Sequence, residues 1–419
     1  MPFSSRRSFL TRLGMAPVLG SMLGHTVPPW PADDALPEDF WARIRAQYPL
    51  TFRRVYFNAG GLGPAPHAVL NAQRDTIDLC QRRSEAMYRF ITEARPEVAA
   101  FIGALPQEVA FLRNATEGNA TIASGLDLRG GDEVIFESHA HPGGSIPWMS
   151  RQKRDGIRVN VFEPDSQSEA GNLERIEALI TPQTRVIQVS HITAPTGIRM
   201  PVEAIARMAK DRGIWFHVDG AQSAGMIPVD VKAIGCDSYA TSGHKWLGAP
   251  HGTGLLYVRE DRLDEVVPTD VGAYSDATYA LPDTLTFHPS ARRYESGTRD
   301  AAPVVGMLEA VRFMQRIGME RVAAHGFGLA RYLADTFRAM EGVHVLSPEP
   351  AEMATSMTAF QVPGKSHEQI YRALREEYQF RCRIVSELGL NAIRVSTHVF
   401  NNATECERLA GVVGILARA

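Results

Sequence analysis

The chain has 419 residues, a charged fraction of 22% and a formal net charge of −3 at pH 7, which suggests an ordinary globular protein of two or three domains. This near-neutral balance gives no reason to expect a nucleic-acid partner, and no apolar run approaches the roughly 20 residues that a stable membrane span needs. The four cysteines lie far apart without CxxC spacing, so a metal cluster is not expected and disulfide pairing stays open (Cys80, Cys236, Cys382, Cys406).

Residues 1–31 differ in kind from the rest. They open with SRRSFL (5–10), continue through a mildly apolar stretch, and precede the first acidic residue, Asp33. Paired arginines followed by Phe-Leu and an apolar run are typical of a twin-arginine signal. We therefore expect residues 1–31 to engage the twin-arginine translocation machinery, which would deliver the protein to the periplasm already folded. No clean A-x-A site marks where the signal is cleaved.

Beyond a polar and aromatic approach over residues 32–57, strand-like and helix-like runs alternate to about residue 260. The predicted strands are EVAFLR (108–113), DEVIFES (132–138), RVNVFEP (158–164), TRVIQVSHI (184–192), IWFHVD (214–219), DSYAT (237–241) and GLLYV (254–258). Helical runs lie between them, around 172–180 and in PVEAIARMAKDRG (201–213). This alternation predicts an α/β fold with a mostly parallel sheet covered on both faces. Ligands bind such sheets outside the carboxyl ends of the strands.

A long helical pattern from about 302 to 340 suggests a link between a large domain and a smaller one. We expect residues 32–57 to pack with the small domain and residues 58–301 to form the large, cofactor-binding domain. The linking helix and the small C-terminal domain would take up residues 302–419.

Two side chains follow neighbouring predicted strands at this edge. Asp219 ends WFHVD, on the same strand face as His217, and Lys245 follows the next strand in SGHKWLG. Burial beside aromatic rings lowers the pKa of a lysine and frees a nucleophilic amine. A carboxylate and a Schiff-base lysine on one rim match a pyridoxal phosphate (PLP) site, where the Asp keeps the pyridine nitrogen protonated. Alone, Asp219 could equally be a helix cap.

The phosphate of such a cofactor needs its own binding site. RNATEGNA (113–120) follows a strand and starts a helix, so the backbone N–H groups of Thr116 and Glu117 could hold an anion there. Ordinary capping by Asn or Thr is the alternative. Ser242 and His244 are further donors within reach of the same phosphate.

The loop HAHPGG (139–144) carries two histidines, His139 and His141. One ring could stack on the pyridine face. An HxH pair also suggests a metal, but no Asp, Glu or Cys lies at a supporting spacing, so no metal site is expected.

Four segments resemble the class V aminotransferase family of fold type I PLP enzymes: VDGAQSAG (218–225), SYATSGHKWLGAPHGTGLLYV (238–258), YESGTRD (294–300) and IRVSTHVFNN (393–402). The family includes cysteine desulfurases, kynureninases and isopenicillin N epimerase-like proteins. The likeness covers roughly residues 55–405 and keeps the family's motif order. It implies a fold type I PLP-dependent transferase, with a large central domain and a smaller α+β C-terminal domain.

The resemblance also implies roles for single residues. Lys245 matches the Schiff-base lysine, and Asp219 matches the partner of the pyridine nitrogen. Gln222 matches the residue that hydrogen-bonds the ring hydroxyl. His141 matches the stacking ring, although a shift of two residues would give that role to His139.

For the phosphate, the matching residues are Thr116, Ser242 and His244. Thr253 and Thr298 match residues that reach the phosphate from the other subunit, which implies a homodimer with composite active sites.

At the substrate end, Arg394 matches the arginine that binds the α-carboxylate through a bidentate pair. A surface salt bridge is the plain alternative for an arginine. Asn58, in YFNAGGLGP, is expected to line the same end of the pocket.

Two positions depart from the commonest family pattern. Ala194, in SHITAPTG (190–197), stands where most relatives carry Asn, as in the isopenicillin N epimerase-like branch. Cys382, in QFRCRIV (379–385), lies 12 residues before Arg394 (394 − 382) in a strand-like run, not on a mobile loop. Desulfuration through a protein persulfide is therefore not expected.

These features predict an exported PLP enzyme acting on the amino group or α-carbon of an amino acid or peptide amine. Transamination, epimerisation, elimination and decarboxylation stay open, with Lys245 as the natural general base or acid. Export favours tailoring of a peptide or siderophore, as in pyoverdine maturation.

Three other functions are to be compared with this one. An amino-acid epimerase or C–S lyase of the isopenicillin N epimerase-like type is the alternative. An inactive binding protein is disfavoured, because the lysine, aspartate and arginine are all present. A nicotinamide dehydrogenase is excluded, because AGGLGPAP (59–66) lacks G-x-G-x-x-G spacing.

Overall fold

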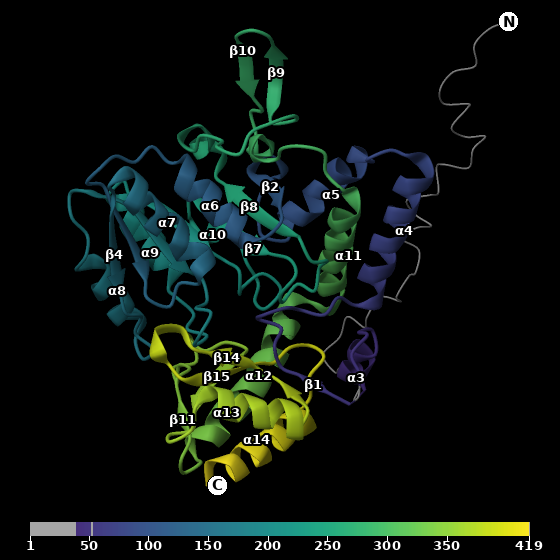
Figure 1. The fold of residues 1–419 in the computed structure, drawn as a ribbon, viewed down its shortest axis with the longest axis vertical. Coiled ribbons are helices and arrows are strands. Elements are labelled where there is room, and N and C mark those ends of the chain that lie inside the picture. Colours follow the sequence, from purple (N-terminus) through teal and green to yellow (C-terminus); the bar gives the residue numbers. More distant parts are fainter. Residues whose placement is uncertain (1–38, 52, 419) are drawn as a thin grey trace, which may run out of the picture.

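A computed structural model of the chain, which describes residues 39–51 and 53–418, has a seven-stranded sheet at its centre (Figure 1). The strand order is β2-β8-β7-β6-β5-β3-β4. Strands β3 to β7 pair in parallel, whereas β8 runs antiparallel to β2 and β7, so the predicted mostly parallel sheet is confirmed. The strands are β2 (Val109–Leu112), β3 (Glu133–Glu137), β4 (Arg158–Phe162), β5 (Thr184–Ser190), β6 (Trp215–Asp219), β7 (Ser238–Ser242) and β8 (Gly254–Val258). The predicted signal, residues 1–31, lies outside the described residues.

Helices cover both faces of this sheet (Figure 1). One cluster of buried apolar residues joins Phe216 and Tyr239 to α4, α5, α9 and α11, and a second joins Trp215 and Ala240 to α6 and α7. Successive strand residues point to opposite faces, so Asp219 points with Trp215 toward α6. The helices are α4 (His67–Arg83), α5 (Tyr88–Ala100), α6 (Ala115–Gly125), α7 (Pro142–Asp155), α8 (Glu169–Glu177), α9 (Val202–Asp211), α10 (Val231–Ile234) and α11 (Ala301–Ile317).

The long helical run predicted over about 302–340 is two helices. The first, α11, ends at Ile317, and α12 (Met319–Arg338) begins after Gly318. Gly318 has φ 92°, a value that residues with a side chain rarely adopt, so the helix breaks there. The two helices then serve different units, because α11 packs on α4 and α5 whereas α12 packs on α14 and β12.

A second, antiparallel sheet of order β11-β12-β15-β14 lies at the C-terminal end with its own apolar core (Figure 1). Its elements are β11 (His344–Val345), β12 (Met357–Gln361), β14 (Arg383–Val385), β15 (Ala392–Ser396), α13 (His367–Arg372) and α14 (Ala403–Arg418). Near it, α3 (Phe40–Arg45) precedes β1 (Val55–Tyr56), which pairs with β13 (Phe380–Arg381). An isolated bridge joins Asn58 to Ser396. The chain just before the loop of residues 60–63, called the GGLG loop below, is therefore attached to the C-terminal sheet.

A hairpin of β9 (Asp276–Ala280) and β10 (Thr284–Phe287) projects from the large sheet, at the top of Figure 1. Tyr279, Leu281 and Leu285 on it are exposed by 64%, 79% and 55%. Such apolar exposure on a projecting arm suggests contact with another chain.

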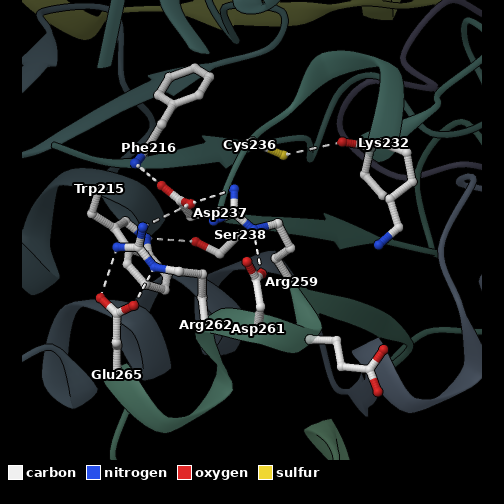
Figure 2. Close-up of polar contacts among 12 residues, drawn as sticks. Trp215, Phe216, Lys232, Cys236, Asp237, Ser238, Arg259, Asp261, Arg262 and Glu265 are labelled. Atoms are coloured by element: carbon white, nitrogen blue, oxygen red, sulfur yellow. Dashed lines mark hydrogen bonds and ion pairs between the residues drawn. The ribbon is translucent and has the colours of Figure 1, made fainter. Parts of the chain in front are cut away.

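The amino ends of β6 and β7 are held by a charged network (Figure 2). Asp237 accepts a hydrogen bond from the Phe216 N–H at 2.8 Å. The same carboxylate forms ion pairs with Arg259 at 3.1 Å and Arg262 at 3.6 Å. Arg262 also lies over the Trp215 ring, 4.9 Å from its centroid. At this end of the strands, the buried carboxylate is therefore paired with arginines of the same chain.

Three further features bear on function. Within residues 39–51 and 53–418, no helix combines the length and apolar character that crossing a bilayer requires. The same described residues hold no group of three or more His, Cys, Asp or Glu side chains that could bind a metal ion. All four cysteines are free thiols.

Candidate active site

Lys245 lies just beyond the carboxyl end of β7. Gly63 donates its backbone N–H to the His244 carbonyl at 2.8 Å, and a Cβ on Gly63 would lie 1.7 Å from the Lys245 carbonyl oxygen. The GGLG loop therefore needs glycine to pack against the lysine backbone. Burial lowers the pKa of Lys245 from 10.5 to about 8, with Asp219 opposing the shift and Arg394 adding to it. A sizeable fraction of the amine is neutral near physiological pH.

Asp219 ends β6 and is held by neutral donors. Its Oδ1 accepts the Ala221 N–H at 3.0 Å, and its Oδ2 accepts Asn119 Nδ2 at 2.8 Å. Asn119 lies on α6, is 1% exposed and was missed by sequence reasoning. The available signal was an amide on the helix face that also carries the buried Gly118 and Ile122. Asp219 is thus oriented while its charge stays uncompensated by these contacts.

A chain of hydrogen bonds with one direction supports this carboxylate. Asn119 Nδ2 must donate to Asp219, so its Oδ1 accepts from His217 Nε2 at 2.8 Å. Burial lowers the pKa of His217 to about 4, so the ring is neutral and its Nδ1 accepts from Ser238 Oγ at 2.8 Å. Ser238 in turn accepts from Trp215 Nε1 at 3.0 Å. Every hydrogen bond in this chain is donated in the direction of Asp219.

The two loop histidines have different surroundings. His141 is the N-cap of α7, where its Nδ1 accepts the Gly143 N–H at 3.0 Å. Burial lowers the pKa of His141, and the charges of Lys245 and Asp219 also act on it. His139 instead hydrogen-bonds Thr196 Oγ1 at 3.0 Å and faces Glu163 at 3.3 Å. The structure therefore brings His141 to the lysine and the aspartate.

At the start of α6, the two predicted phosphate contacts, Thr116 and Glu117, have different surroundings. A Cβ on Gly143 would lie 2.3 Å from Thr116 Oγ1, so Thr116 lies beside the His141 loop. The Glu117 N–H, however, donates to Asn114 Oδ1 at 3.0 Å, which is the capping alternative. The Glu117 carboxylate binds the Arg113 backbone N–H at 2.6 Å. Glu117 thus differs from its predicted role, because the helix cap uses its N–H group.

The remaining phosphate candidates lie on the same side. Ser242 Oγ accepts the Ala115 N–H at 3.0 Å, and His244 Nδ1 is buried without a hydrogen-bond partner among the described residues. Thr253 Oγ1 donates to the Pro250 carbonyl at 2.6 Å. Thr253 and Thr298 both line a cavity of about 360 Å³, whose lining includes neither Lys245 nor Asp219. Arg113 and Glu117 also line this cavity, so it borders the start of α6.

Gln222 links three parts of the site. Its Nε2 donates to the Gly60 carbonyl at 2.9 Å, and its Oε1 accepts Trp246 Nε1 at 2.8 Å. A Cβ on Gly60 would lie 2.9 Å from both Gln222 Oε1 and Arg394 Nη2. The loop that follows Asn58 thus runs between the glutamine and the arginine.

Arg394 is 1% exposed and lies on β15. Its Nη1 donates to the Ala194 carbonyl at 2.5 Å, and its Nη2 donates to Asn58 Oδ1 at 3.4 Å. Burial lowers the pKa of Arg394 to about 9. Arg394 Nε and Ser396 Oγ are buried without hydrogen-bond partners among the described residues. The arginine is therefore held by one short and one long hydrogen bond, and its Nε is left for a ligand.

Cys382 is fully buried between β13 and β14, and burial raises the pKa of its thiol to about 12. A thiol that is buried and protonated is a poor nucleophile.

These residues fit PLP. Lys245 offers a desolvated amine for the aldehyde, and Asp219 offers a carboxylate with free charge for the ring nitrogen. The buried and unpartnered His244 Nδ1 and Arg394 Nε are atoms for which a ligand would supply partners. Among the predicted residues, the Glu117 N–H, the Thr253 hydroxyl and the Gln222 amide already have hydrogen-bond partners within the chain.

Comparison with known proteins agrees with this chemistry. The family described as aminotransferase class-V matches residues 69–409. The isopenicillin N epimerase of Amycolatopsis lactamdurans is 29% identical over 397 residues, covering 90% of this chain and 99% of that protein. The apo structure of the cysteine desulfurase from Thermococcus onnurineus NA1 superposes with a TM-score of 0.82 at 27% identity, covering 93% of this chain and 100% of that one.

A further solved structure carries the cofactor itself. It is a lysine-to-alanine mutant of C-DES with glycine covalently linked to the PLP cofactor, with a TM-score of 0.81 at 26% identity, covering 88% of this chain and 98% of that one. The predicted fold type I architecture and the PLP cofactor are confirmed by these matches. The chain belongs to the class V aminotransferase family and is a PLP-dependent enzyme.

Proposed function

We propose that this enzyme acts at the α-carbon of an amino acid or a peptidyl amine, with Lys245 transferring the α-proton. The observation that carries the proposal is the convergence of three groups. The charges of Asp219 and Arg394 both act on the pKa of Lys245, which burial lowers. Lys245 follows β7, Asp219 ends β6 and Arg394 lies in β15. No other cluster among the described residues combines a desolvated amine with an oriented carboxylate and a buried guanidinium.

When bound, PLP supplies an electron sink for charge left at the α-carbon. Arg394 binds the substrate carboxylate, and its Nη1 contact with the Ala194 carbonyl fixes the guanidinium plane. Asp219, oriented by Asn119, keeps the ring nitrogen protonated. The Lys245 amine takes the α-proton and returns it, because a pKa near 8 suits both steps near neutral pH.

The principal alternative is an epimerase or a C–S lyase. The isopenicillin N epimerase match supports the first, and a structural neighbour described as the cystine C–S lyase C-DES supports the second. Both reactions require α-proton removal and no protein thiol, which suits a chain whose Cys382 is buried and protonated. A persulfide route through Cys382 is disfavoured for the same reason.

The test begins with the lysine and continues to the α-carbon. PLP-loaded protein is reduced with borohydride, and peptide mapping should find the label on Lys245. L- and D-amino acids are then incubated in D₂O, and NMR should detect exchange of the α-proton. Inversion would identify an epimerase, keto-acid and ammonia release a lyase, and conversion of the cofactor to its amine form a transaminase. Absence of the label, or of exchange with every amino acid, would contradict the proposal.

We further propose that the enzyme is exported by the twin-arginine route and tailors a peptide or siderophore in the periplasm. The support is the SRRSFL pattern within residues 1–31. Fusing residues 1–31 to a reporter tests it. Export should stop when Arg6 and Arg7 are both changed to Lys, and export that persists would exclude this route. A mass change of a siderophore precursor incubated with the enzyme would test the tailoring.

A homodimer with composite sites is also proposed. Its support is the exposed position of Thr298 beside Thr253 in one cavity, and the apolar hairpin that projects from the large sheet. Light scattering should give twice the chain mass. Mixing inactive Lys245→Ala with inactive Thr298→Ala chains should restore part of the activity, whereas a fully active monomer would rule the arrangement out.

A further inference from the structure

A second arginine, Arg383, faces the substrate end of the site. It lies directly opposite Arg394 in the antiparallel pairing of β14 and β15. Opposite residues in such a pair project from the same face of the sheet. The positive charge of Arg383 contributes to the lowered pKa of Lys245 and to that of His141. Arg383 is therefore part of the same electrostatic site, although no motif identified it.

Arg383 has one acidic partner, Glu387, which binds its Nη2. The pair is about three-quarters buried, with side-chain exposures of 24% and 28%. Arg383 Nη1 is buried and has no hydrogen-bond partner among the described residues. The guanidinium thus presents a fork with one nitrogen occupied by a carboxylate and one nitrogen unused.

The charges on this side are unbalanced. Arg383 and Arg394 bring two positive charges, and Glu387 is the carboxylate whose charge acts on Arg394. The α-carboxylate of a substrate pairs with Arg394 alone. Arg383 then keeps Glu387, unless the substrate carries a second anion that competes for the same fork. The space beside Arg383 already accommodates a carboxylate, which indicates the size and shape of the group it accepts.

We propose that Arg383 binds a second carboxylate of the substrate, so that the substrate class is an α-amino acid with a side-chain carboxylate. Glu387 occupies Arg383 until that carboxylate displaces it. The inference rests on the proposed function, since Arg394 must hold the α-carboxylate for Arg383 to meet the side chain. A guanidinium binds a carboxylate through two parallel hydrogen bonds, which an uncharged amide of the same shape cannot reproduce.

L-glutamate and L-glutamine form the matched probe pair, because they differ only in the charged end. Calorimetry on the PLP-loaded enzyme should give a dissociation constant at least about tenfold lower for L-glutamate. Arg383→Gln should raise the dissociation constant of L-glutamate to that of L-glutamine. It should change the dissociation constant of L-glutamine by no more than about twofold. Glu387→Gln should lower the L-glutamate value several-fold, since the internal competitor is gone, with L-glutamine unchanged.

Arg331→Gln is the control, because Arg331 forms an exposed i,i+4 pair with Asp335 on α12, and it should change neither value. Arg383→Lys keeps the charge without the fork and should recover only part of the selectivity. Equal binding of the two amino acids to the wild type, or equal losses for both in Arg383→Gln, would overturn the inference. In that event Lys245 still carries the borohydride label and α-proton exchange persists, whereas failure of the proposed function removes the label or the exchange.

Discussion

Asp219 and Asp237 lie at opposite ends of neighbouring strands, and their surroundings differ. Asp237 is paired with Arg259 and Arg262 (Figure 2), so its charge is neutralised inside the fold. Asp219 is oriented by the neutral amides of Asn119 and Ala221. Because neither contact neutralises Asp219, its charge remains for a cationic ring. One end of the strands has thus been closed by ion pairs and the other left reactive.

The two ends are also connected. Hydrogen bonds pass from Trp215 to Ser238, His217 and Asn119 and end on Asp219. Trp215 and Ser238 belong to the closed end in Figure 2. The rigid end therefore sets the orientation of the reactive carboxylate, and the contrast can be tested by matched changes at the two ends.

The largest effect is expected at the two lysines. Lys245→Ala should lower activity by roughly 10³-fold or more, because it removes the amine that transfers the proton. Lys232→Ala should leave activity near the wild-type value. It should instead cost about 1–3 kcal/mol of unfolding free energy, because the fully buried Glu108 loses its ion-pair partner. Steady-state rates and urea unfolding measure the two outcomes. A loss of activity in Lys232→Ala with none in Lys245→Ala would refute the assignment of catalysis to Lys245.

The two aspartates should separate in the same way, with a smaller effect. Asp219→Asn should lower kcat by roughly 10²-fold, since an amide cannot hold a proton on the ring nitrogen. Asp237→Asn should keep kcat and lose about 1 kcal/mol of stability, because it leaves Arg259 and Arg262 without their shared carboxylate. Similar kcat values for the two variants would show that Asp219 is structural as well.

Lys245 also predicts a pH dependence of stability. Its folded-state pKa of about 8 lies below the unfolded value of 10.5, so the unfolded state binds more protons between these values. The lysine therefore costs stability below pH 8, and the cost disappears as the pH rises toward 10.5. In cofactor-free protein, Lys245→Met should gain up to about 2 kcal/mol at pH 7, less than the full shift gives because Lys245 is partly exposed. Urea unfolding at pH 7 and pH 10.5 measures this gain, and a constant difference would argue against it.

The smallest effect is expected at the link between the ends. Asn119→Ala should lower kcat about tenfold, since Asp219 loses a donor, and should shift the pH titration of the cofactor absorbance. The matched control is Asn172→Ala on α8, because Asn172 is equally buried but bonds the Asp165 backbone. It should lower stability alone. An unchanged titration in Asn119→Ala would mean that the link is structural only.

Sequence pattern predicted the elements well, because the strands of the large sheet other than the edge strand β4 are buried on both faces and are rich in apolar residues. All seven predicted strands form, with ends displaced by two residues or fewer. Asp219 and Lys245 could be named because both follow a strand, and position along a strand determines the edge at which a residue emerges. These predictions depend on local order alone.

What was missed depends on docking between distant segments. Asn119 matters because α6 packs over the end of β6, and Arg383 matters because β14 pairs with β15 beside the site. The break at Gly318 was missed because the flanking pattern stays helical on both sides. Whether Glu117 offers its N–H depends on one rotamer of Asn114, which sequence does not specify.

The segment that follows β1 has a mechanical consequence. Asn58 is bridged to Ser396 in the C-terminal sheet, and five residues later Gly63 is bonded to the His244 carbonyl. This tether is too short to absorb much movement, since five residues span at most about 18 Å even when fully extended. If the C-terminal sheet tilts when a substrate binds, the movement is therefore transmitted along this segment to the backbone that carries the reactive amine.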